Sequence, residues 1–500
     1  MKIYLNKFNG GLTMEKYSKY RGVSSESVGF DIMKYKDRIS PHPDKSDERL
    51  GSSGGTLSLS IMDACNVGAE LIAIAKYDSG ATGTRFLKKY DNDPRNNYWV
   101  FETNCTNLAN PNFCISYKGY AYANAGATLY KRTSSTTVSS IGTMTISSAS
   151  YGSLPIKAVV HSQDNVLYMA YGDRIQKYDG TTFTAGVLTM PSDIYAIEEY
   201  GQYLAIYCYR DDGTAMCYFW GRDTSLTTLQ DAIPIGHGLP KIAKVIDGIL
   251  FAVCEVGRTI YIRALVGGTF KQISTFDFPS PSSQSLNYFS YKKDNKIYFA
   301  LNNGISFVFG QNADGEYVVS ADRNYIATGE TSSAVYGMFA LTYNVGSGAG
   351  SIFHYMSVDV VSGTVGTCRM IYPDDGAVEN SLTFYGNSRW TTSYNPEMPV
   401  EDLARQKTLK FIRAKLYLKT PSATGTFTLS YETDQSGTFT TIDAKSIAST
   451  DPNVYILEAN AESSSIPFAT AKDFRFRLTT ASGKKVDLHQ LEYEYEVNNA

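Results

Sequence analysis

The sequence predicts an all-β protein: a seven-bladed β-propeller followed by a small antiparallel β-sandwich, with an extended N-terminal arm. One observation is a set of alternating apolar runs that end at Gly or Asp, such as NVLYMAYGDRIQKYDG at Asn165–Gly180. This stretch predicts a β-hairpin followed by a second turn, because Gly and Asp tolerate tight reversals and the residues between them suit strands. The other observation is that similar runs recur at a regular spacing along most of the chain.

The repeat is measured between equivalent positions in the recurring runs. Successive anchors are about 37 to 55 residues apart, in the range of four-stranded propeller blades. The seven anchors predict seven blades; six or eight stay open because the first and last repeats are the least regular. A closed ring is favoured over an open solenoid, since no polar capping repeats are present. The anchors are Leu71, Tyr120, Val166, Tyr203, Ile249, Ile297 and Ile352.

Changes in periodicity predict four segments. Residues 1–60 have little periodicity and are expected to be an extended arm on the propeller or a neighbour, with a flexible tail as the alternative. Residues 61–380 contain the repeats and form the predicted propeller. Residues 381–407 include Trp390 and a loop between two prolines, which indicates a linker. Residues 408–500 carry about six alternating runs, which favours a β-sandwich.

The last strand of this sandwich has acids at every second position. Glu492, Glu494 and Glu496 alternate with apolar residues, so this face is expected to be solvated.

Composition limits the classes of partner. With 46 Lys+Arg against 49 Asp+Glu, the net charge of -3 gives no electrostatic reason to expect nucleic-acid specificity or binding to an anionic membrane. No apolar run has transmembrane length and Met1–Gly11 lacks the centre of a signal peptide, so no membrane anchor is expected. The 38 Tyr suit protein contacts, and they equally suit strand positions.

The cysteines are expected to be reduced core residues of a protein made in a cytoplasm. Their number is odd, no CxxC occurs, and Cys208 and Cys217 are placed on the two arms of one predicted hairpin. The seven are Cys65, Cys105, Cys114, Cys208, Cys217, Cys254 and Cys368.

No metal or cofactor motif is recognisable. None of the five histidines stands in an HExxH or HxH context, and there is no GxSxG, P-loop or GxGxxG after a strand. The glycine-rich stretch Asn344–Gly350 joins two strand-like runs, which favours a loop. The histidines are His42, His161, His237, His354 and His489.

Acidic residues need separate treatment, because propeller glycosidases use a pair of carboxylates. The candidates stand at turns, where Asp is common for conformational reasons alone: Asp173, Asp211, Asp212, Asp374 and Asp375. Tyr431–Ile442 is similar to an Asp-box turn, but two residues separate Asp434 from Gly437, Phe439 takes the aromatic place, and the motif occurs once. Asn312 and Asp314 offer calcium ligands without EF-hand spacing. We therefore predict no catalytic, cofactor-binding or metal site, and no enzyme.

The layout resembles a family of bacteriophage virion proteins. Those proteins open with an FNGG-type segment, continue into a β-propeller and close with a small β-sandwich; here the matching stretches are FNGGL at Phe8–Leu12, the repeats and the C-terminal runs. Two branches are similar: the tail nozzle proteins of short-tailed phages, whose Arg-Pro-Gly signal is not evident here, and the propeller-bearing minor structural proteins of longer-tailed phages.

The resemblance implies a structural protein of a virion, tail- or neck-associated, that acts as a rigid assembly and contact module. Its implied partners are other tail or neck proteins and further copies of itself in a ring, with assembly in the host cytoplasm and a final place in the virion tail. The alternative is a tail-tip protein that binds a receptor or host glycan through aromatic residues such as Trp390 and Tyr394.

Overall fold

The computed structural model shows an all-β chain. Most of its described residues are in strands, with one short 3-10 turn at Tyr90–Asn92 and no α-helix among them, which confirms the predicted class. The structure describes residues 2–5, 24–28, 30–31, 33, 40–41, 45–50, 60–77, 83–94, 98–106, 111–222, 229–277, 284–322, 325, 332–343, 351–360, 367–371, 389–394, 405–418, 425–434, 436, 438–447, 454–460, 470–472, 474–481 and 486–498.

The chain divides into two compact units. The larger unit spans Lys45–Gly304 and Glu330–Pro373. The smaller unit combines Met1–Asp44, Ile305–Gly329 and Asp374–Ala500.

Most sheets of the larger unit have four antiparallel strands. In four of them, each strand pairs with the next strand along the chain. The first two are β11 (Cys114–Tyr117), β12 (Tyr120–Ala125), β13 (Thr128–Ser134) and β14 (Thr137–Thr143); and β15 (Lys157–His161), β16 (Val166–Tyr171), β17 (Arg174–Tyr178) and β18 (Phe183–Thr189). The next two are β19 (Ile194–Tyr200), β20 (Tyr203–Tyr209), β21 (Thr214–Trp220) and β22 (Asp231–His237); and β23 (Leu239–Ile246), β24 (Ile249–Val256), β25 (Thr259–Val266) and β26 (Thr269–Asp277).

The remaining strands of this unit lie before β11 and after β26 in the chain. One sheet has the order β6-β10-β9-β8-β7, and another has the order β31-β32-β33-β5. Strand β27 (Leu286–Lys293) pairs antiparallel with β28 (Lys296–Leu301). The bounds of the others are β5 (Lys45–Asp47), β6 (Arg49–Leu50), β7 (Ser60–Val67), β8 (Glu70–Tyr77), β9 (Gly83–Lys89), β10 (Tyr98–Thr106), β31 (Ser332–Tyr343), β32 (Ser351–Val360) and β33 (Thr367–Ile371).

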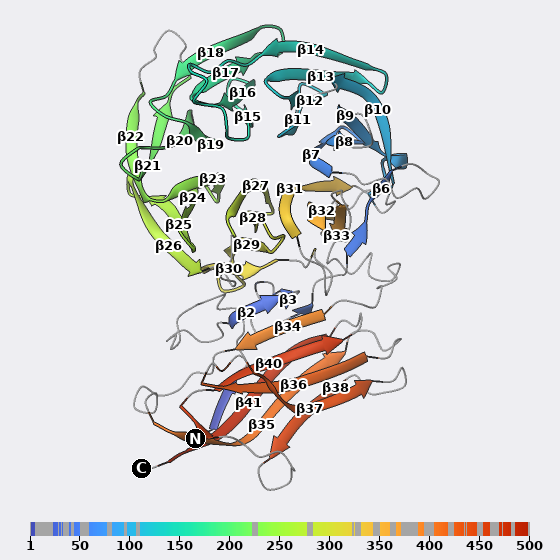
Figure 1. Cartoon of the computed structure of the whole chain (residues 1–500), viewed down its shortest axis with the longest axis vertical. Coiled ribbons are helices and arrows are strands. Elements are labelled where there is room, and N and C mark those ends of the chain that lie inside the picture. Colours follow the sequence, from blue (N-terminus) through green and yellow to red (C-terminus); the bar gives the residue numbers. More distant parts are fainter. Residues whose placement is uncertain are drawn as a thin grey trace. The chain divides into compact units, whose positions relative to one another are not determined.

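The first strands of these sheets contact one another in a cycle. Strand β7 contacts β11, and the contacts continue through β15, β19, β23 and β27 to β31, which contacts β7. Figure 1 shows these strands facing the middle of the larger unit, with β10, β14, β18, β22 and β26 outside. Each sheet therefore has neighbouring sheets on both of its faces.

The sequence repeat is found in the strands. Every repeat anchor lies on the second strand of its own group, in β8, β12, β16, β20, β24, β28 and β32. The predicted hairpin at Asn165–Gly180 is confirmed: Tyr171 pairs with Arg174 across the two residues Gly172 and Asp173. Gly172 has φ 56°, a left-handed conformation that costs glycine little.

Apolar side chains fill the space between neighbouring sheets. Trp220 packs edge-to-face on Tyr168, with ring centroids 5.9 Å apart, and both side chains are buried. Cys208 and Cys217 lie on the adjacent strands β20 and β21, as predicted, and all seven cysteines are free. Such packing holds each sheet on both faces, which makes a ring of sheets stiff.

A short segment, Lys45–Leu50, joins the first and last sheets of the larger unit; we call it the closing segment. Its strand β5 pairs with β33, where Asp47 lies opposite Arg369, and its strand β6 pairs in parallel with β10, where Leu50 lies opposite Trp99. Asp47 and Arg369 also form an ion pair of 3.0 Å. Both ends of the repeat region are therefore hydrogen-bonded to one six-residue stretch.

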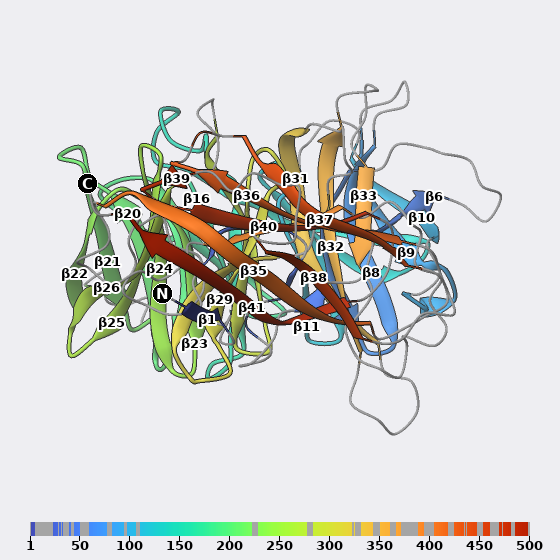
Figure 2. The ribbon, with the colours of Figure 1, turned by 90° about the horizontal axis from the view of Figure 1, so that it is seen from below.

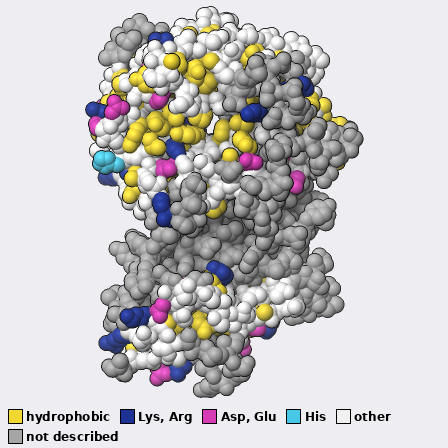
Figure 3. Space-filling view, viewed as in Figure 1, with side chains coloured by type: hydrophobic (Ala, Val, Ile, Leu, Met, Phe, Trp, Pro, Cys, Tyr) yellow, Lys and Arg dark blue, Asp and Glu magenta, His cyan; other side chains and the backbone are white. Residues whose placement is uncertain are grey.

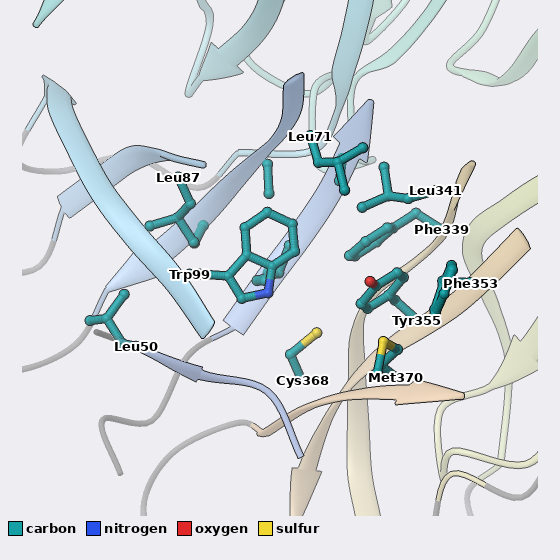
Figure 4. Packing of buried hydrophobic residues seen from close by; sticks show 14 residues of the cluster. Leu50, Leu71, Leu87, Trp99, Phe339, Leu341, Phe353, Tyr355, Cys368 and Met370 are labelled. Atoms are coloured by element: carbon teal, nitrogen blue, oxygen red, sulfur yellow. The ribbon is translucent and has the colours of Figure 1, made fainter. Parts of the chain in front are cut away.

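Glu48, in the middle of the closing segment, is buried against the first sheet. Its carboxylate accepts hydrogen bonds from the Lys89 ammonium and the Trp99 indole N–H, and its backbone N–H donates to the Cys368 carbonyl at 2.8 Å. Burial raises the pKa of Glu48 and lowers the pKa of Lys89, and each opposes the shift of the other. Figure 4 shows Leu50, Trp99, Cys368 and Met370 among the residues of the surrounding apolar cluster.

The smaller unit contains two five-stranded sheets. In one, β41 and β35 run side by side, as Figure 2 also shows, with β38 beside β35. Strand β29 (Ser306–Gln311) pairs with β30 (Tyr317–Ala321), and β3 (Phe30–Asp31) pairs with β4 (Ser40–Pro41). The two sheets comprise β1 (Lys2–Leu5), β41 (Val486–Val497), β35 (Lys407–Leu418), β38 (Val454–Asn460) and β39 (Thr470–Ala471); and β2 (Ser24–Val28), β34 (Arg389–Tyr394), β40 (Phe474–Ala481), β36 (Gly425–Thr433) and β37 (Thr440–Ile447).

The six C-terminal runs all form strands, as predicted, and β39 is an additional short one. The N-terminal strands β1 and β2 also join these sheets, beside β41 and β34. The expectation of a solvated acidic face on the last strand is wrong for Glu492, which is only 4% exposed and lies 3.8 Å from the Arg413 guanidinium. Glu496, toward the end of the same strand, is exposed.

Candidate functional site

A cavity of about 110 Å³ lies where the innermost strands of the larger unit meet; we call it the axial cavity. Strands β7, β15, β19, β23, β27 and β31 all contribute to its wall. In the view of Figure 3, described apolar side chains gather around the middle of this unit. The charged and aromatic side chains that line the cavity are Asp63, Phe113, Lys157, Lys241, Lys244, Tyr288 and Phe289.

The three lysines differ in their partners. The Lys241 ammonium donates to the Glu255 carboxylate, the Ser285 hydroxyl and the Leu286 carbonyl at 2.7, 2.6 and 2.8 Å. Lys244 pairs with Glu198 at 3.2 Å. Among the described residues, no carboxylate lies within ion-pair distance of Lys157, whose ammonium donates to the Tyr288 carbonyl at 2.8 Å. Lys157 is therefore the ammonium of this wall that lacks a counter-ion.

Desolvation by the surrounding protein shifts the pKa of two cavity groups toward neutrality. It lowers the pKa of Lys157 from 10.5 to about 7, and the nearby Lys244 charge acts in the same direction. It raises the pKa of Asp63 from 3.8 to about 7, although the Asp63 carboxylate accepts hydrogen bonds from the backbone N–H groups of Cys114 and Ala64 at 2.8 and 2.9 Å. Both residues are partly exposed, and both line the cavity.

The aromatic ring of Tyr288 lies between two ammonium groups. Lys241 Nζ is 4.9 Å from the ring centroid and Lys157 Nζ is 5.3 Å from it, both within cation–π range. Tyr195 packs on the same ring, with centroids 6.4 Å apart. Burial raises the pKa of Tyr288 to about 12, so its hydroxyl stays neutral and contributes no negative charge to the cavity.

Replacing Lys157 with methionine is expected to raise the Tm at neutral and acidic pH. The unfolded chain keeps the ordinary Lys pKa of 10.5 while the folded chain has about 7, so the wild type becomes more stable as the pH rises between these values. The advantage of Lys157→Met should fade over that range. Thermal unfolding at about pH 6, 8 and 10, in buffers without oxyanions, measures the Tm difference between the variant and the wild type.

Lys271→Met, at an exposed position of β26, is the matched control. Its Tm should differ from that of the wild type by the same amount at every pH. If Lys157→Met were less stable than the wild type at about pH 6, the ammonium would have to be well solvated or paired, contrary to its surroundings.

Those acidic candidates at turns that belong to the described residues lie outside the axial cavity. Asp173 is buried and its carboxylate accepts the Ser147 backbone N–H at 3.0 Å, so it anchors a loop. Asp212, which follows Asp211 in the turn after β20, accepts the Thr214 N–H at 2.9 Å. Hydrogen bonds lower the pKa of Asp212.

The other two turn candidates also have conformational roles. Asn312 Oδ1 accepts the N–H groups of Asp314 and Glu316, each at 2.9 Å, as a turn requires. Asp434 accepts the Lys472 N–H at 2.9 Å, and the Arg477 guanidinium lies 3.4 Å from the centroid of the Phe439 ring.

Several predicted features fall outside the described residues. These are Phe8–Leu12, His42, Asn344–Gly350, Asp374, Asp375 and Gly437, together with the side chains of Trp390 and Tyr394. In the part of the chain that is described, no cluster of three or more His, Cys, Asp or Glu is arranged to hold a metal ion. No helix among the same residues is long and apolar enough to cross a membrane.

The cavity residues were missed by sequence reasoning. Asp63, Lys157, Lys241 and Lys244 stand in first strands of the repeat, whereas the repeat is clearest in second strands. Lys241 and Lys244 are three apart and would lie on opposite faces of a regular strand. A register shift between Pro240 and Ile242 breaks that alternation, and both lysines line the cavity. Lysines in otherwise apolar first strands are the signal that points to such a site.

Comparisons with known proteins give likenesses of structure only. No protein-family model matches the chain, and no curated protein sequence matches it. The WD40 domain of Toxoplasma gondii coronin is similar with 11% identity, covers 70% of this chain and 90% of its own, and has a TM-score of 0.41.

Two further solved structures are similar at the same level. KlHsv2, in a form with loop 6CD replaced by a Gly-Ser linker, has 11% identity, 60% and 93% coverage and a TM-score of 0.35. An exo-β-1,3-galactanase of Phanerochaete chrysosporium has 8% identity, 91% and 100% coverage and a TM-score of 0.27. At these scores the likenesses say nothing about what this chain does.

Proposed function

We propose that the larger unit is a seven-bladed β-propeller and that the C-terminal sheets form a β-sandwich. The cycle of contacts from β7 to β31 and back supports the ring, with one repeat anchor in each group of strands. Phe476 of β40 and Tyr493 of β41 support the sandwich, since they belong to different sheets and their ring centroids are 5.1 Å apart.

We propose that this protein is a structural component of a bacteriophage virion, tail- or neck-associated, that serves as a rigid assembly and contact module. The observation that carries the proposal is the closing segment, which hydrogen-bonds to both ends of the repeat region through β5 and β6. A ring closed in this way resists opening under load and presents separate loops to several neighbours. Its partners are other tail or neck proteins and further copies of this chain.

The composition of the axial cavity favours a binding or structural role over glycoside hydrolysis. That reaction needs two carboxylates flanking the bond that breaks. Asp63 is the one carboxylate among the described lining residues, and three lysines line the cavity with it. An isolated carboxylate beside ammonium groups does not supply the required pair.

Two measurements test the virion role. Mass spectrometry of purified particles from the phage that encodes this chain should detect it in several copies per virion. Light scattering and negative-stain electron microscopy should show rings, either of the protein alone or after other tail proteins are added. A chain absent from particles, or a persistent monomer that ignores tail proteins and binds a cell-surface glycan, would contradict the proposal and favour the receptor-binding alternative.

A further inference from the structure

The axial cavity has a surplus of hydrogen-bond donors at one point of its wall. An ammonium carries three N–H donors. Those of Lys241 reach three protein acceptors, whereas the only described acceptor of Lys157 is the Tyr288 carbonyl. Two N–H donors of Lys157 are therefore left for a group inside the cavity.

The neighbouring carboxylate does not fill this role. Asp63 lies beyond ion-pair distance of Lys157, and its two oxygens accept the N–H groups of Ala64 and Cys114. Glu198 and Glu255 are engaged by Lys244 and Lys241. A counter-charge for the protonated form of Lys157 would therefore come from outside the described residues of the chain.

We propose that the axial cavity binds one small oxyanion on the Lys157 ammonium, beside the ring of Tyr288. An oxyanion supplies both the negative charge and the several acceptors that the ammonium lacks. This inference is independent of the virion role, since it concerns only the wall of the ring.

The size of the cavity limits the class of ligand. An engineered cavity of about 150 Å³ holds benzene, so the smaller axial cavity, about 110 Å³, suits phosphate, sulfate or a short carboxylate. Phe113, Tyr288 and Phe289 supply aromatic side chains to the lining beside the ammonium.

Binding should be coupled to proton uptake. The bound anion favours the charged form of Lys157 and the neutral form of Asp63, and both groups titrate near neutrality. The other charged groups facing this point form ion pairs with one another. These are Lys241 with Glu255 and Lys244 with Glu198.

Isothermal titration calorimetry of the full chain with sodium phosphate, sodium sulfate and sodium acetate tests the proposal, at constant ionic strength near neutral pH. The wild type should bind at least one of them saturably, with one site per chain. Lys157→Met should weaken that binding by about tenfold or more, because it removes a charge-assisted hydrogen bond. Lys271→Met should bind as the wild type does.

A second measurement needs no variant. Wild-type titrations in two buffers of different ionisation heat should show net proton uptake that grows between about pH 6.5 and 8. Absence of saturable binding for all three anions, equal affinity in Lys157→Met, or binding without proton uptake would each overturn the proposal.

Discussion

Replacing Lys89 with methionine is expected to lower the free energy of unfolding by about 3–5 kcal/mol, the usual loss when one partner of a buried ion pair is removed. The Lys89 and Glu48 side chains are both fully buried, and Glu48 Oε1 has no hydrogen-bond partner among the described residues. Without Lys89 the carboxylate keeps only the Trp99 indole N–H. Because Glu48 belongs to the closing segment, its loss of a partner should weaken the pairing of this segment with β10 and β33. Urea unfolding at neutral pH measures it.

Lys88→Met is the matched control, at the adjacent position of the same strand. Its ion pair with Glu70, 2.6 Å long, is about one-third exposed on both sides, so the change should cost less than about 1 kcal/mol. Combining Lys89→Met with Glu48→Gln should recover part of the stability, since the amide is neutral and still accepts from Trp99. Equal losses in the two lysine variants would mean that the buried pair contributes no more to the free energy of unfolding than the exposed pair does.

The loss in Lys89→Met should also depend on pH. Burial raises the pKa of Glu48 and the Lys89 charge opposes that rise, so Glu48 should take up a proton more readily in the folded variant than in the folded wild type. Such a group stabilises the fold below its unfolded pKa and stops doing so as the pH rises through the folded value. The variant should therefore be closer to the wild type at about pH 5 than at about pH 8. A loss that is constant over this range would argue against a buried carboxylate.

Gly337→Ala is expected to destabilise the protein by about 3 kcal/mol, through a clash where the last sheet meets the first. A Cβ at Gly337 would lie 2.2 Å from the Met62 carbonyl oxygen and 2.5 Å from that of Ile61. Both atoms belong to the backbone of β7, which cannot move without breaking its own pairing with β8. Thermal and urea unfolding should both detect the loss.

Gly221→Ala is the control for this change. Its Cβ would meet the end of the Gln230 side chain at 2.9 Å, and a flexible side chain can move aside. We expect a cost within about 1 kcal/mol. If Gly337→Ala were equally mild, the approach of β31 to β7 would be looser than the structure has it.

Local patterns in the sequence predicted the strands and turns well. Apolar alternation located β16 and β17, and Gly172 marked the turn between them, because both depend on residues close in the chain. The repeat anchors identified second strands, which pair on both edges and are the most uniformly buried. The six C-terminal runs were found for the same reason.

Pairing between distant segments had no local signal. Lys45–Asp47 lies beside Arg369–Ile371, more than 300 residues away, and nothing in its polar sequence marks it as a strand. Glu492 looks solvent-facing by alternation and is buried; its register partners on β1 and β35 are Tyr4 and Arg413. The residues 1–60 expected as an arm contain β5 and β6, which belong to sheets of the larger unit.

The amino-acid pattern alone gave an all-β chain, its repeat and most of its strand positions, since alternation and turn chemistry act over a few residues. The axial cavity and the closing segment arose only in the folded ring. Asp63, Lys157 and Lys244 come from three strands that are far apart in sequence, and the contacts between first strands bring them together. The shifted pKa values of Asp63 and Lys157 follow from that crowding, which no single strand contains.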